Sequence, residues 1–540
     1  MSRPLLSILI ALLGLSRAAA QLPAPPAPAG NPVTPTKVLL GKALFWDEQL
    51  SATRQVACGT CHFPTAGGGD ARAQLQGPET MHPGFDGVFG TADDVVGSQG
   101  VIRNTATGHY EPAPFFGLEA QVTPRKTPSM INAAFAPRLF WDGRAGGAFT
   151  DPLSGEVLFD GHAALETQAA SPPVSEVEMG HVGIDWTQVV ARIENAVPLA
   201  LASDVPAELA AFVSDKTYTQ LFIQAFDAPQ VTPARIAMAI ASYERVLISD
   251  DAPVDDFPNG FTQQEIMGST LFDSKARCAF CHSAPLFTDH SFRNIGLRPP
   301  FEDLGLGAVT GDPADDGKFK MPSLRNVELR APFFHNGGKS TLEEVVEFYD
   351  VGGEFHAGQD PDIQPLNLTQ AEKDALVAYL KTFTDPRVRD GLPPFDRPTL
   401  YSETAKVPAL YGAPTPGFSG SVPASIAVEP PFLTNPSLTV GLKNGLGGAL
   451  GVLVLGAAAE PAGLPVAGIT LHLALAPAPV VYSVGSLGGV GPGNGFRSEV
   501  FGLSLGPAAV GQSVFGQWIV VELAPGPSLA ASDAFALTFF

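Results

Sequence analysis

The sequence predicts a mainly α-helical protein that ends in an all-β, sandwich-like module. Apolar residues recur at helical spacing through much of residues 34–385, as at Ile236, Ile240 and Leu247. One five-residue pattern, Cys-x-x-Cys-His, occurs twice, each time after a helical stretch, which indicates two related helical domains. From about residue 400, charged residues become rare, and short alternating apolar runs such as 469–473 are typical of strands.

The two copies of this pattern contain every cysteine of the chain. The cysteines are Cys58, Cys61, Cys278 and Cys281, and the histidines that follow them are His62 and His282. In a c-type haem site, two thiols add to the vinyl groups of the porphyrin, and the next histidine becomes an axial ligand of the iron. The sequence therefore predicts two covalently bound c-type haems in two cytochrome-c-like domains.

Three other uses of cysteine pairs explain the pattern less well. A four-cysteine zinc ribbon needs two pairs about 15–20 residues apart, and Cys61 and Cys278 lie far beyond that separation. Disulfides are chemically compatible with an exported protein, but they leave the histidine after each pair unexplained. A thioredoxin-like redox site explains neither the histidine nor the duplication.

The haem motifs and the change in composition divide the chain into four predicted parts. We expect a signal peptide at 1–20, an N-terminal haem domain at 21–254, a C-terminal haem domain at 255–400 and a β-rich module at 401–540. Gly, Asp and Pro dominate the stretch 64–125, which we interpret as a loop insertion in the first haem domain. The β-rich module carries no chemical motif that indicates its role.

The first residues have the pattern of an export signal. Arg3 is followed by an apolar run from Leu5 to Leu15 and then by the small residues Ala18–Ala20. The run is shorter than the roughly 20 residues that a membrane-spanning helix needs. We therefore expect a periplasmic or secreted protein, which also suits the attachment of c-type haem outside the cytoplasm.

The protein is strongly acidic, with a formal net charge of −22. Residues 401–540 contain only six acidic and three basic residues, so most of the charge lies in the haem-bearing part. This balance opposes nucleic-acid binding, which needs a basic surface. An acidic surface attracts a basic electron-donor protein, although it often serves solubility alone.

A local cluster of charge lies in the loop insertion, where Asp86, Asp93 and Asp94 alternate with glycines. Calcium prefers such oxygen ligands, but the bidentate glutamate that closes an EF-hand loop is missing. The sequence leaves both calcium binding and a plain acidic loop open, and it favours the plain loop.

Further motifs follow one another in a fixed order between residues 34 and 385. Besides the two haem motifs, they are Leu40–Phe45, Phe140–Ala145, Glu178–Met179, Pro322–Val327 and Pro332–Gly337. With them the chain resembles the bacterial di-haem cytochrome c peroxidase family, which includes the oxidase MauG. The resemblance implies that hydrogen peroxide reacts at the N-terminal haem. It also implies a donor protein for the C-terminal haem, such as a small cytochrome c or a cupredoxin, and leaves a homodimer open.

The resemblance also implies roles for single residues. His62 and His282 would be the proximal ligands of the two irons, and Trp141 would lie between the haems as an electron relay. Glu178 would be the distal acid and Gln168 the distal amide of the peroxide site. A carboxylate so placed can move a proton from the near to the far oxygen of peroxide, so that water leaves.

The sixth ligand of the second haem departs from many members of the family. Tyr349 stands where those members have Met, and in this respect the chain resembles MauG. A phenolate oxygen lowers the potential of the iron relative to a thioether, which favours a haem that stores oxidising equivalents. The alternatives are Met321 or His335 as the ligand, with Tyr349 as a core residue on its helix.

Two other departures concern the first haem and calcium. The loop position at which related proteins carry a distal histidine falls near Leu118, with only His109 close by, so we expect an open first haem. The positions that would hold an inter-haem calcium correspond to Lys126 and Arg330. Their positive charges would repel calcium, and a salt link to a haem propionate is a substitute.

These features support three hypotheses for the function. The first is an exported di-haem peroxidase that reduces hydrogen peroxide with electrons from a donor protein. The second is a MauG-like oxidase that acts on an organic or protein substrate. The third is an electron-transfer protein without turnover.

Overall fold

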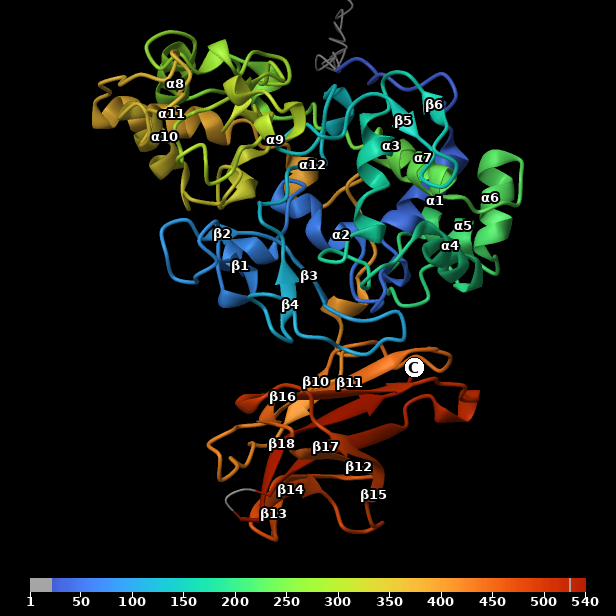
Figure 1. Ribbon diagram of the computed structural model, residues 1–540. Helices are drawn as coiled ribbons and strands as arrows, with labels where there is room; N and C mark the ends of the chain where they lie inside the picture. Colours follow the sequence, from blue (N-terminus) through green and yellow to red (C-terminus); the bar gives the residue numbers. More distant parts are fainter. Residues whose placement is uncertain (1–21, 524–525) are drawn as a thin grey trace, which may run out of the picture.

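Helices form two units that lie side by side, and the β module lies below them (Figure 1). The computed structural model describes residues 22–523 and 526–540, so the predicted signal peptide lies outside the described residues. None of the helices in this described part is long and apolar enough to cross a membrane.

The first unit is built around helices α1 and α7, which pack at close distance. Leu40 and Leu44 of α1 share one core with Ile236 and Ile240 of α7. Gly41 permits this approach, because a Cβ atom at that position would lie 1.9 Å from the carbonyl oxygen of Ala239 in α7. The helices of this unit are α1 (Pro35–Phe45), α2 (Cys58–Cys61), α3 (Ala164–Ala169), α4 (Trp186–Asn195), α5 (Ala207–Val213), α6 (Tyr218–Phe226) and α7 (Pro233–Glu244).

The second unit repeats this arrangement with α8 and α11. Gly268 of α8 faces α11, where a Cβ atom would lie 2.0 Å from the carbonyl oxygen of Ala375. In both units the Cys-x-x-Cys-His motif follows the first helix, as α2 in one case and as a 3₁₀ turn at Cys278–Phe280 in the other. The helices here are α8 (Gln263–Asp273), α9 (Gly307–Thr310), α10 (Leu342–Asp350) and α11 (Gln370–Lys381). The next helix, α12 (Pro386–Arg389), belongs to the first unit, because its Val388 joins the core of that unit.

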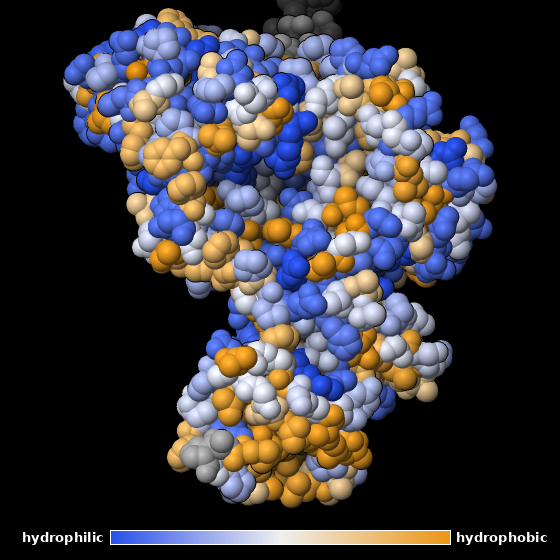
Figure 2. All heavy atoms as spheres, in the orientation of Figure 1, coloured by the Kyte–Doolittle hydropathy of each residue, from blue (hydrophilic) through white to orange (hydrophobic). Residues whose placement is uncertain are grey.

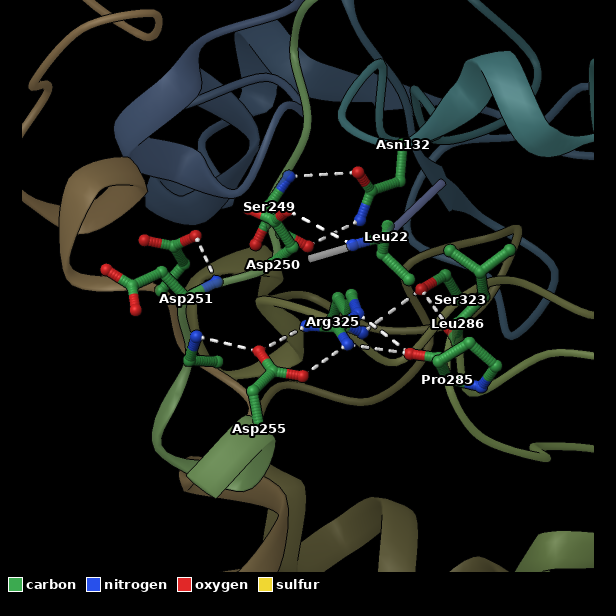
Figure 3. Close-up of polar contacts among 12 residues, drawn as sticks. Leu22, Asn132, Ser249, Asp250, Asp251, Asp255, Pro285, Leu286, Ser323 and Arg325 are labelled. Atoms are coloured by element: carbon green, nitrogen blue, oxygen red, sulfur yellow. Dashed lines mark hydrogen bonds and ion pairs between the residues drawn. The ribbon is translucent and has the colours of Figure 1, made fainter. Parts of the chain in front are cut away.

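Polar contacts hold the segment that joins the two units (Figure 3). Two hydrogen bonds join Ser249 and Asn132. The Ser249 amide donates to the side-chain oxygen of Asn132 at 2.9 Å, and the side-chain nitrogen of Asn132 donates to the Ser249 carbonyl oxygen at 3.0 Å. The guanidinium of Arg325 binds both carboxylate oxygens of Asp255 at 2.6 and 2.9 Å, and its Nε donates to the carbonyl oxygen of Pro285 at 2.9 Å. The Arg325 side chain is only 2% exposed.

We expect Arg325→Met to destabilise the protein by about 3–5 kcal/mol, because it leaves the Asp255 carboxylate without its partner in a buried site. The measurement is urea unfolding followed by circular dichroism. The control is Lys275→Met, which removes an exposed ion pair with Glu372 and should cost about 1 kcal/mol or less. Equal losses in the two variants would contradict the expectation.

The β module is a sandwich of two antiparallel sheets. One has the strand order β10-β11-β16 and the other the order β15-β12-β17-β18-β9. Val440, Leu453, Trp518 and Phe535 fill the core between them. The strands of the module are β9 (Ala409–Tyr411), β10 (Ala424–Ala427), β11 (Leu438–Gly447), β12 (Leu450–Gly456), β13 (Ala459–Val466), β14 (Ile469–Leu473), β15 (Val480–Ser486), β16 (Gly491–Phe501), β17 (Ser513–Glu522) and β18 (Ser528–Thr538). Of these, β13 and β14 pair with each other in a separate two-stranded sheet. Figure 2 shows apolar residues gathered at the lower end of this module.

The module is attached to the first helical unit. The Tyr110 hydroxyl donates to the buried Glu429 carboxylate at 3.0 Å, and Arg54 donates to Ser437 at 2.7 Å. The connecting segment contacts the same unit, since Lys42 forms an ion pair with Asp396 at 2.8 Å. The chain therefore returns to the first unit before it enters the module.

The expected fold class was wrong in one respect, because the protein is not mainly α. It has 27% helix and 22% strand, with a β-rich C-terminal region. Long loops separate the helices of both units, and the ten strands of the module add most of the strand content. Short strands in the helical units pair as β1 (Met81–His82) with β2 (Val95–Val96), β3 (Gln99–Ile102) with β4 (Ala120–Val122), β5 (Phe149–Thr150) with β6 (Val157–Phe159) and β7 (Phe292–Arg293) with β8 (Phe319–Lys320).

Candidate functional site

A cavity of about 350 Å³ reaches both Cys-x-x-Cys-His motifs. Cys58, Cys61 and His62 line it from the first unit, and Cys278 and His282 line it from the second. Cys281 packs beside it in an apolar cluster. All four cysteines are free thiols in the structure, so the disulfide alternative has no support.

Both motif histidines are oriented in the same way. The ring Nδ1 of His62 lies 3.2 Å from the carbonyl oxygen of Gly68, and that of His282 lies 3.0 Å from the carbonyl oxygen of Phe287. A carbonyl oxygen only accepts, so Nδ1 must carry the proton and Nε2 keeps its lone pair for a metal. Burial lowers the pKa of both histidines, which also favours the neutral, ligating form.

This set of donors fits two covalently attached haems. Each unit offers two thiols and an imidazole beside one shared cavity. Burial raises the pKa of the Cys61 thiol to about 12, so this cysteine is held as a neutral thiol.

The predicted peroxide-site residues Glu178 and Gln168 both line the cavity. Main-chain hydrogen bonds hold the residues on both sides of Glu178. The carbonyl oxygen of Val177 accepts from the amide of Val101 at 3.1 Å, and the carbonyl oxygen of Met179 accepts from the amide of Ala52 at 2.7 Å. Desolvation raises the pKa of the Glu178 carboxyl, and the positive charge of Arg144 opposes this shift. The carboxyl can therefore exchange a proton closer to neutral pH than an exposed glutamate can.

Trp141 is held where the two units meet. Its indole Nε1 donates to the carbonyl oxygen of Lys126 at 2.7 Å, and its own carbonyl oxygen accepts from the amide of Lys320 at 2.8 Å. Its ring contacts the ring of His335 edge to face, with 6.3 Å between centroids. His335 in turn stacks on Phe319 with centroids 3.5 Å apart.

The three candidates for the sixth ligand of the second haem all line the cavity. Tyr349 lies on α10, packs edge to face against Phe334 and Phe348, and joins the apolar cluster that contains Met321 and Cys281. Burial raises the pKa of the Tyr349 hydroxyl. His335 lies apart from this cluster, against Phe319 and Trp141. The choice of Tyr349 stays a prediction.

The loop that was considered for a distal histidine lies away from the cavity. Leu118 packs with Tyr110 and Ile426 at the β module, and His109 Nδ1 lies 3.2 Å from the Ser498 hydroxyl. Neither residue is among those that line the cavity.

The Asp-rich loop directs its carboxylates to its own backbone. Asp93 accepts from the amides of Phe85 and Asp86 at 2.6 and 2.9 Å, and Asp94 accepts from the amide of Gly90 at 2.7 Å. Within residues 22–523 and 526–540, no group of three or more His, Cys, Asp or Glu side chains is placed to hold a metal ion.

Two cavity residues were not anticipated from the sequence. Lys320 and Glu244 line the cavity, and one carboxylate oxygen of Glu244 is buried without a hydrogen-bond partner. Burial raises the pKa of Glu244 to about 8. Glu244 follows the apolar residues of α7 directly, where a charged residue is normally solvent-exposed, so its position gave no signal.

The fold and the site together define a c-type cytochrome with oxidoreductase chemistry. The model of the di-haem cytochrome c peroxidase family matches residues 35–263. Methylamine utilization protein MauG of Methylorubrum extorquens is 32% identical over 364 residues, which cover 66% of this chain and 80% of that protein. The chain belongs to the di-haem cytochrome c peroxidase family and is a di-haem oxidoreductase.

Two further similar proteins are as follows. Cytochrome-c peroxidase IdrP1 of Denitromonas iodatirespirans is 30% identical over 407 residues, covering 68% of this chain and 87% of that protein. The crystal structure of a MauG-like protein associated with microbial copper homeostasis is 26% identical. The aligned region covers 71% of this chain and 97% of that chain, with a TM-score of 0.49.

Proposed function

We propose that this protein is an exported di-haem peroxidase that reduces hydrogen peroxide with electrons from a donor protein, such as a small cytochrome c or a cupredoxin. One observation carries the proposal: both Cys-x-x-Cys-His motifs line one cavity together with Glu178, Gln168 and Trp141. Export rests on the pattern of residues 1–20 and suggests the periplasm as the location.

The residues of the chain have separate roles in this proposal. When bound, the haems supply the iron site for peroxide and the storage of oxidising equivalents. Glu178 accepts the proton of the near peroxide oxygen and delivers it to the far oxygen, which then leaves as water. Gln168 orients the substrate by hydrogen bonding, and Trp141 occupies the space between the two units.

The first experiment counts haems and measures turnover on the same preparation. A pyridine haemochrome assay should give two haems per chain, and peroxide should be consumed with a reduced small cytochrome c. Two haems without peroxide consumption in either redox state would reject the peroxidase. Iron that is inert to cyanide at both haems would support the non-catalytic electron-transfer protein.

A second candidate is a MauG-like oxidase acting on an organic or protein substrate. The position of Tyr349 favours it, because a tyrosine ligand suits a haem that retains oxidising equivalents. Peroxide added to the fully oxidised protein should then cause a long-lived spectral change that Tyr349→His abolishes. Rapid turnover with a reduced small cytochrome c would favour the peroxidase instead.

The pH dependence of peroxide reduction tests Glu178 as the base. Only the ionised carboxylate accepts a proton, so kcat/KM should fall as pH drops through its raised pKa. Arg144→Met removes the charge that favours ionisation, so the acidic limb of the profile should move to higher pH. Arg298→Met, which breaks an ion pair with Glu302 in the second unit, is the control. An unmoved limb in Arg144→Met would contradict the assignment.

A further inference from the structure

Three cationic side chains lie close enough to influence one another where the two helical units meet, since the charge of Arg330 acts on both Lys126 and Lys320. Lys126, Lys320 and Arg330 all line the cavity. The ammonium of Lys126 donates to the carbonyl oxygen of Arg330 at 2.8 Å, while its main-chain carbonyl oxygen holds the Trp141 indole at 2.7 Å. The amide of Lys320 donates to the carbonyl oxygen of Trp141 at 2.8 Å. Trp141 is therefore bound to the main chains of Lys126 and Lys320, and the side chain of Lys126 reaches the main chain of Arg330.

None of these three cations forms an ion pair with a carboxylate in the part of the chain that the structure describes. The contrast with their neighbours is clear. Arg125 binds Asp142 and Asp303, both at 2.6 Å. The side chain of Arg330 donates to the neutral carbonyl oxygen of Ser323, and its Nε is buried without a partner.

The environment of the cluster is unfavourable for positive charge. Lys126 is only 6% exposed. Burial, together with the charge of Arg330, lowers the pKa of Lys126 to about 7 and that of Lys320 to about 8. Buried charges in proteins are normally paired. A cluster of this kind is completed by anions that the polypeptide itself does not supply.

We propose that Lys126, Lys320 and Arg330 form a carboxylate-binding site that takes propionate groups from both haems and so joins the two haems electrostatically. The inference rests on the proposed function, because it needs both haems. Vinyl and propionate groups lie on opposite edges of the porphyrin, so attachment at the cysteines directs the propionates away from them. In this arrangement the cations of the chain itself would neutralise the propionates, so the haem pair would need no calcium.

The test measures the midpoint potentials of both haems by spectroelectrochemical titration. A cation beside a propionate stabilises the electron-richer ferrous haem. Lys126→Met and Lys320→Met should each make reduction at least tenfold less favourable at one or both haems, which is a lowering of about 59 mV. Lys126→Arg should retain the potentials. Lys339→Met, which removes a surface ion pair with Glu354, is the control with the same change of charge.

Three results would overturn the inference. The first is a shift in both methionine variants that is no larger than in Lys339→Met. The second is a wild-type potential that changes when calcium is added or chelated, because a metal would then occupy the bridge. The third is a preparation with fewer than two haems, and this result alone also rejects the proposed function.

Discussion

Glu178→Gln is expected to lower the kcat of peroxide reduction by about 10²–10⁴-fold, the usual contribution of a positioned acid–base group. The amide keeps the size and the burial of the side chain but cannot accept the proton of peroxide. The desolvation that raises the pKa of Glu178 makes the carboxylate a stronger base than an exposed one. The measurement is steady-state peroxide consumption with a reduced small cytochrome c.

Glu176→Gln is the matched control for this variant. Glu176 lies two residues away, but its carboxylate pairs with Arg103 at 3.3 Å and accepts from the amide of Gly183 at 2.9 Å. Its side chain is 41% exposed, and it is not among the residues that line the cavity. The control should retain activity and both haems. Equal losses in the two variants would mean that Glu178 acts through the local fold and not as a base.

Tyr349→Met is expected to raise the midpoint potential of the C-terminal haem by more than about 59 mV, which corresponds to a tenfold change in the reduction constant. A phenolate stabilises ferric iron more strongly than a thioether does, and axial ligands spread haem potentials over roughly 0.8 V. The variant should also lose the long-lived spectral response to peroxide. Redox titration of each haem band provides the measurement.

Met321→Leu separates the two main ligand candidates. Met321 lies in the same apolar cluster as Tyr349 and is 5% exposed, so leucine keeps the packing and removes only the sulfur. If Tyr349 is the ligand, Met321→Leu should leave the potential almost unchanged. A large shift in Met321→Leu with none in Tyr349→Met would assign the thioether instead.

The sequence was most informative where short spacing determines chemistry. The Cys-x-x-Cys-His motifs could be recognised from their spacing, whereas Glu178 was predicted only through the resemblance to the family. Both motifs and Glu178 contribute to the lining of one cavity. The resemblance pointed to Lys126 and Arg330, but Lys320 could not be added to them from the sequence, because it meets Lys126 only in the fold. The helix content was overestimated because long loops separate the helices and because the C-terminal module contributes ten strands.

The path of the chain gives the second helical unit an unusual place in the protein. The chain leaves the first unit beside Asp250 and Asp251 and returns beside Asp385 and Arg387. These two connecting segments are bound to each other. Asp250 and Arg387 form an ion pair at 2.8 Å, and the Asp251 amide donates a hydrogen bond to the Asp385 carboxylate at 3.2 Å. In topology, the second unit is thus an insertion with neighbouring entry and exit points. Evolution can replace such an inserted unit without interrupting the core of the first unit and without separating the β module from that unit.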